Sequence, residues 1–159
     1  MRRPNLHGWA YAHTPPQGTS QQSVLQFFRS GAVEFYVSLN RLLVGPSLIL
    51  GGRLERRIVV SIERSLEWLK KCDKEAPFII YVTFFNVRTY KIARVYPGDG
   101  GGPGFQQTTN YLPGLLVEHV PASRGELALV LQPTIDTVWQ AAGSNRSPFF
   151  RSGEWDEQT

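Results

Sequence analysis

The sequence predicts an α+β domain, in which a mostly antiparallel sheet of five or six strands packs against two helices. Three features support this class: one stretch with apolar residues at helical spacing, several short aromatic and β-branched runs, and turn signals between those runs. The chain has 159 residues, 42% of them hydrophobic, so it can bury one core. We expect a single domain over 23–143, a partly ordered segment over 1–22 and a polar tail over 144–159.

The first strands are expected before residue 38. Residues 1–22 are rich in Pro, Gln, Ser and Thr, and their one aromatic stretch predicts a strand near residues 8–12. Apolar runs at 24–28 and 32–37 flank the turn signal Arg29-Ser30-Gly31 and predict a β-hairpin. Residues 38–44 fit either a further strand or a short helix.

A helix over residues 53–71 is the clearest element. Val59 and Trp68 widen its apolar stripe, and lysines in its last turn complement the helix dipole. Cys72 is the only cysteine, and it is expected at the helix end as a small residue without a reactive role. The stripe itself follows spacings of four and three and consists of Leu54, Ile58, Ile62, Leu66 and Leu69.

Further strands are expected after this helix. Residues 78–85 are apolar at nearly every position, which predicts a central strand buried on both faces. Residues 90–96 and 115–120 predict two more strands, the first with one wetter face. The glycine-rich residues 97–104 predict a loop. That loop lacks the Lys-Ser/Thr pair and the following helix of a phosphate-binding loop.

A second helix is expected over residues 133–142. Pro133 is acceptable in a first helical turn and Gly143 is a natural stop, although a helix can also open earlier, within 126–131. In the tail, the apolar side chains able to pack onto the core are Phe149, Phe150 and Trp155.

No catalytic residue, metal site or cofactor is predicted. The acidic residues are scattered, and Glu118 and His119 would point to opposite faces of a strand. Glu34 is expected to face solvent or to pair with Arg29. One cysteine and three histidines do not form a zinc-ligand pattern, and the single cysteine favours a reducing, cytoplasmic setting.

Basic clusters permit an interaction with nucleic acid. The net charge is +4, and cations beside tyrosines suit contacts to phosphates and stacking on bases. A solvated surface is the ordinary interpretation of such clusters. No run approaches the roughly 18–20 apolar residues of a membrane span, so no membrane partner is predicted. The candidate nucleic-acid contacts are Arg53, Arg56, Arg57, Arg88, Lys91 and Arg94.

Four strings carry a resemblance: PNLHG (4–8), VLQFFRSGAVE (24–34), LQPTIDTVWQAAG (131–143) and RSP (146–148). Together they resemble the C-terminal region of bacterial proteins that begin with a Schlafen-type AlbA domain, which is associated with nucleic-acid or ATP binding. The similarity covers about residues 4–150. The AlbA domain itself is absent, so no functional residue carries over. The resemblance implies a companion domain as a partner.

Three functions follow as hypotheses. The first is a non-catalytic accessory or interaction module associated with nucleic-acid-binding machinery, as the resemblance implies. The second is direct nucleic-acid binding through the basic clusters. The third is an enzyme whose site converges from scattered residues and is not readable from the sequence.

Overall fold

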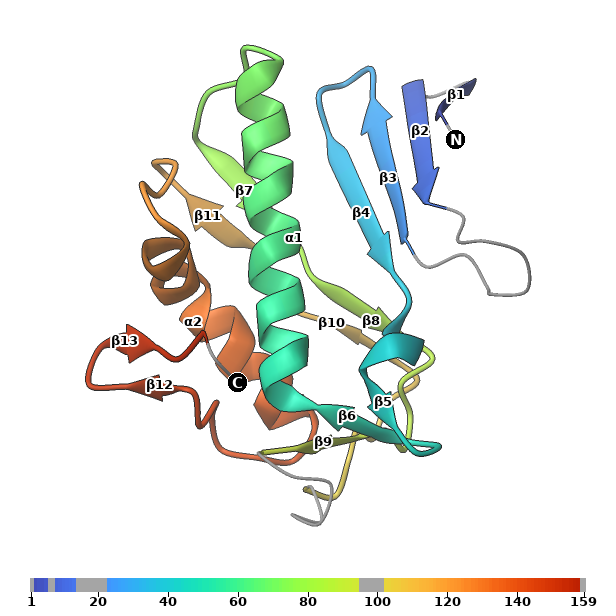
Figure 1. Ribbon diagram of the computed structural model, residues 1–159, viewed down its shortest axis with the longest axis vertical. Coiled ribbons are helices and arrows are strands. Elements are labelled where there is room, and N and C mark those ends of the chain that lie inside the picture. The colour runs from blue at the N-terminus through green and yellow to red at the C-terminus, as the bar shows by residue number, and fades with distance from the viewer. Residues whose placement is uncertain (1, 6–7, 14–22, 95–101, 158–159) are drawn as a thin grey trace.

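The computed structural model describes residues 2–5, 8–13, 23–94 and 102–157, and it confirms the α+β class (Figure 1). Two helices, α1 (Gly51–Lys71) and α2 (Arg124–Ala141), lie among strands that form several small sheets. In the described residues the largest sheet has four strands rather than five or six. The strands after residue 42 are two or three residues long, which is too short to support one continuous sheet.

The N-terminal sheet is an antiparallel meander with the order β1-β2-β3-β4. Its strands are β1 (Arg2–Asn5), β2 (Gly8–His13), β3 (Ser23–Phe28) and β4 (Val33–Val37). The predicted strand near 8–12 and the predicted hairpin are therefore confirmed. Burial alternates along β4 and leaves Glu34 exposed, as expected for a strand with one face toward the protein.

A short segment connects this sheet to α1. It contains a 3-10 helix, η1 (Leu39–Leu42), followed by β5 (Leu43–Val44) and β6 (Leu48–Leu50). For residues 38–44 the sequence allowed either a strand or a short helix, and the structure has both: a short helix followed by a short strand. β6 pairs with β5 and, in parallel, with β9 (Lys91–Ala93). β9 lies within the strand predicted at 90–96 but is shorter, since residues 90 and 94 are not in a strand; residues 95 and 96 lie outside the described residues.

The predicted first helix is confirmed, and it begins two residues early at Gly51. A Cβ on Gly51 would lie 2.5 Å from the Trp139 indole, so glycine permits α1 to start against that ring. Leu54, Val59 and Leu66 are buried in the main core. The rest of the predicted stripe packs partly buried around them.

The prediction of one central strand over 78–85 is wrong. The run divides into β7 (Phe78–Ile80) and β8 (Thr83–Phe85), which pair with β11 (Leu115–Val117) and β10 (Thr109–Tyr111) in separate two-stranded ribbons. Ile79 is 61% exposed and Tyr81 72% exposed. An apolar composition is compatible with burial of both faces of a strand, but burial also requires other elements to pack on each face.

The second helix is present, but the start expected at Pro133 is wrong: α2 begins nine residues earlier, at Arg124, close to the alternative opening within 126–131. The Ser123 hydroxyl accepts a hydrogen bond from the Glu126 amide, and the Glu126 carboxylate accepts one from the Ala122 amide. This reciprocal capping defines the start more strongly than the proline, which lies inside the helix. The strand predicted at 115–120 is β11, which ends at Val117.

The core lies between the two helices and the short strands of the C-terminal two thirds of the chain. Phe149 is buried in it, and Phe150 and Trp155 pack against it from the hairpin of β12 (Phe150–Arg151) and β13 (Glu154–Trp155), as predicted. Neither described helix is long and apolar enough to cross a membrane. Most of the predicted 97–104 loop lies outside the described residues.

Candidate binding site

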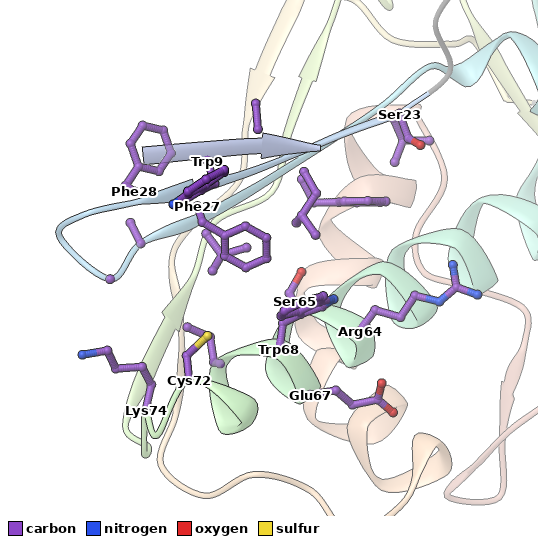
Figure 2. A pocket seen from close by; sticks show the side chains of 18 of the residues that line it. Trp9, Ser23, Phe27, Phe28, Arg64, Ser65, Glu67, Trp68, Cys72 and Lys74 are labelled. Atoms are coloured by element: carbon purple, nitrogen blue, oxygen red, sulfur yellow. The ribbon is translucent and has the colours of Figure 1, made fainter. Parts of the chain in front are cut away.

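A groove with a volume of about 1220 Å³ separates α1 from strands β2, β3 and β4 (Figure 2). One wall is the face of the sheet that points toward α1. Cross-strand pairing places its side chains in rows, because Phe27 lies opposite Val33 and Leu25 lies opposite Phe35. The face is apolar because alternate residues of a strand share one side. Its members on β3 and β4 are Ser23, Leu25, Phe27, Val33, Phe35 and Val37.

The other wall is a side of α1 that lies mostly outside the core; among its residues, Leu69 also packs against the core. Figure 2 shows Ser65 and Trp68 facing the sheet, with Cys72 one turn further along. The Ser65 hydroxyl donates to the Ser61 carbonyl oxygen at 2.9 Å, so its polarity is satisfied within the helix. A small residue at this position leaves the centre of the groove open.

The sheet wall is outside the main core of the protein. The described side chains of β2, β3 and β4 do not belong to the buried cluster that joins α1, α2 and the short strands. Trp68 bridges the two walls at one point, where its ring lies 5.2 Å from that of Phe27. It is 45% exposed, so the prediction that Trp68 widens the core stripe is wrong.

The groove is rimmed mainly by cations. Arg29 and Lys74 lie near the β3–β4 turn, where the Lys74 Cε is 3.7 Å from the position of a Cβ on Gly31. Arg57 lies toward the other end, with its guanidinium carbon 5.9 Å from the centre of the Phe35 ring. Arg64 lines the groove between these ends, and Glu67 is the one carboxylate among its lining residues.

A second polar cluster surrounds Glu55, which is 1% exposed. Its Oε1 accepts hydrogen bonds from Trp139 Nε1 at 2.6 Å and from Ser147 Oγ at 2.5 Å, and its Oε2 accepts one from Trp155 Nε1 at 3.2 Å. Burial raises the pKa of Glu55, and the negative charge of nearby Asp136 raises it further. The three hydrogen bonds lower the pKa, but by less than burial raises it.

The Glu55 cluster is suited to structure rather than to chemistry. Ser147 and Glu55 make a hydroxyl–carboxylate contact, but both are buried and neither lines the groove. Each donor comes from a different segment, so the carboxylate joins α1 to α2 and to the C-terminal hairpin. No buried side-chain nitrogen or oxygen of the described residues lacks a hydrogen-bond partner.

The predicted nucleic-acid contacts are only partly brought together. Arg57 lies in the groove, whereas Arg53 and Arg56 are exposed on the first turns of α1. The parallel pairing of β6 with β9 brings Arg94 to the start of α1, because the Ala93 carbonyl oxygen would lie 2.9 Å from a Cβ on Gly51. Arg88 and Lys91 are exposed nearby along the chain.

The lysines at 70, 71 and 74 form a separate basic end. Seventeen residues of α1 separate Arg53 from Lys70, or about 26 Å at the helical rise. The basic clusters therefore do not form one compact surface.

Other candidates for chemistry remain isolated. Glu34 and His119 are exposed, and neither lines the groove. Cys72 is exposed at the end of α1, where it was predicted. In the part of the chain that the structure describes, no group of three His, Cys, Asp or Glu residues could hold a metal ion.

Sequence reasoning missed both the groove and the Glu55 cluster. The donors to Glu55 lie 84, 92 and 100 residues away, so no local spacing indicates them. The sequence indicates the two walls of the groove, because the hairpin and the helix each have an apolar face, but it does not indicate the space between them. No family model, curated protein or solved structure matches this chain.

Proposed function

We propose that this protein is a non-catalytic interaction module and that the groove between α1 and the N-terminal sheet is its binding element. One observation carries the proposal: an apolar sheet face lies opposite a helix without filling the space between them. Leaving such a surface open to water costs free energy, and large exposed apolar patches are typical of interaction sites.

The chemistry of the lining supports binding rather than catalysis. The groove is larger than the roughly 300–1,000 Å³ of ordinary small-molecule pockets, and apolar side chains make up its sheet wall. Its polar residues are four cations, a few hydroxyl groups, one carboxylate and a thiol. The resemblance to regions that follow AlbA domains is the reason to place this module beside nucleic-acid-binding machinery.

Filling the groove tests the proposal. The probe is the apolar anionic dye 1-anilinonaphthalene-8-sulfonate, which we expect to bind the folded protein saturably. Ser65→Phe should weaken dye binding about tenfold or more, because the new ring occupies the centre of the groove. Thr137→Phe is the matched control, since Thr137 also donates to the carbonyl four residues earlier but lies on α2. Absence of saturable binding, or equal loss in both variants, would refute the proposal.

A second candidate function is nucleic-acid binding at the start of α1. The observation that favours it is the β6–β9 pairing, which brings Arg94 toward Arg53. The test measures the slope of log K against log salt concentration for binding to a labelled 20-base-pair DNA. Replacing both arginines by alanine should reduce the magnitude of this slope by about 1.8, since each phosphate contact contributes about 0.9. The pair Lys70→Ala and Lys71→Ala, at the far end of α1, should leave that slope unchanged.

A further inference from the structure

We infer that the groove receives an acidic amphipathic α-helix from a partner protein. This inference rests on the proposed function, because it names the occupant of the same groove. Three properties of the site support it: the width of sheet that the described residues leave uncovered, the length of the groove and the sign of the charges on its rim.

The sheet is wide enough for a second helix. Four strands at a spacing of about 4.8 Å span roughly 14 Å between the outer strands. α1 contacts this sheet mainly through β4, and Figure 1 shows β3 and β2 lying farther from α1. A helix with side chains is about 10 Å across, so one more helix fits beside α1 over β2 and β3. The resulting two helices on one sheet face form an ordinary two-layer arrangement.

The groove is also long enough for several helical turns. It extends along α1 at least from Arg57 to Cys72, which is fifteen residues or about 22 Å. A helix of about four turns would match this length. Residues at spacings of three and four would then contact Leu25, Phe27 and Trp68.

A helix suits an apolar groove better than an extended peptide. A strand lying across the face of the sheet would bury backbone N–H and C=O groups that the groove cannot pair. A helix pairs these groups internally. A single acyl chain is much thinner than a helix, and it would leave most of the sheet face exposed to water.

The rim charges favour an acidic partner. Arg29, Arg64 and Lys74 are exposed at the groove, and Glu67 alone opposes them in sign among the lining residues. Glutamates on the docked helix would therefore be attracted by Arg64 on α1 and by Arg29 and Lys74 near the β3–β4 turn. A helix with lysines in those positions would be repelled, which makes the charge a selective feature.

The test uses the full chain and three labelled 16-residue peptides. The first has leucines at positions i, i+3, i+4 and i+7 with glutamates on the flanks. The second has lysines in place of the glutamates, and the third is a scramble of the first that breaks the apolar stripe. Fluorescence anisotropy should show the acidic peptide binding at least tenfold more tightly than either of the others, with induced helical circular dichroism.

Two matched variants separate charge from fold. Arg64→Glu at the groove should weaken the acidic peptide by roughly two- to tenfold, since exposed ion pairs contribute about 0.2–1 kcal/mol and reversal adds repulsion. Arg56→Glu, which is exposed on the same helix away from the groove, should not change binding. Because both positions are exposed, both variants should fold. Equal effects of the two variants would overturn the inference.

Other occupants give different results. If dodecanoate binds and Ser65→Phe blocks it while the acidic peptide fails to bind, the groove is a binding element but the inferred helix is wrong. If the chain dimerises and Ser65→Phe makes it monomeric, a second copy is the occupant and the inference is again overturned. If the dye does not bind saturably, the proposed function itself fails.

Discussion

Removing the Glu55 carboxylate should destabilise the protein more than removing any other glutamate of α1. Glu55→Ala leaves the indole N–H of Trp139 and the hydroxyl of Ser147 without their acceptor, and both residues are at most 2% exposed. A buried donor that loses its partner costs about 1–3 kcal/mol, so the two together cost about 2–6 kcal/mol. The Trp155 indole is only partly buried, and water can replace its lost contact.

The expected loss is large relative to the whole stability of a domain, which is about 5–15 kcal/mol. Urea unfolding followed by circular dichroism at pH 7 measures it. Glu63→Ala is the matched control, because Glu63 also lies on α1 and binds Arg124 through an ion pair with Nη2–Oε2 2.9 Å. That partly exposed pair should contribute no more than about 1 kcal/mol. The reasoning is refuted if Glu55→Ala costs no more than Glu63→Ala.

Three further outcomes follow from the same structure. Because the pKa of Glu55 is raised, the folded state binds the carboxyl proton more tightly than the unfolded state does. The stability of the wild type relative to Glu55→Gln should therefore rise as pH falls from 7 to about 5. A difference in melting temperature that stays constant with pH would contradict this. Gly51→Ala should cost about 1–3 kcal/mol in urea unfolding, because the added Cβ would lie 2.5 Å from the Trp139 ring; Gly125→Ala on α2, whose nearest such contact is 4.0 Å, should cost little. Ser123→Ala should lower unfolding free energy by about 1 kcal/mol through loss of the α2 cap, with Ser152→Ala as an unaffected comparison.

Local patterns predicted much of the secondary structure. The stripe that includes Leu54 and Leu66 defined α1, and the turn at Gly31 defined the hairpin of β3 and β4. The start of α2 was also encoded locally, since Ser123 and Glu126 have the spacing of a capping box. The start predicted at Pro133 was wrong because this capping box lies about ten residues before the proline.

The run at 78–85 shows where local pattern stops being informative. Its composition allows burial on both faces, but Ile79 in β7 and Tyr81 just after it are exposed, because the described residues place no second layer over them. Trp68 shows the same limit on a helix. Its spacing is compatible with the core stripe, yet it faces the groove, because α1 has the core on one side and the sheet on another.

The α+β class, the main helix and the N-terminal hairpin were determined by the sequence, because each depends on residues at most a few turns apart. The groove and the Glu55 cluster were decided only by tertiary structure. The distance between the sheet and α1 depends on how the whole chain packs, and Glu55 meets Trp139, Ser147 and Trp155 across 84 to 100 residues. Periodicity describes which face of an element is apolar, whereas packing decides what that face meets.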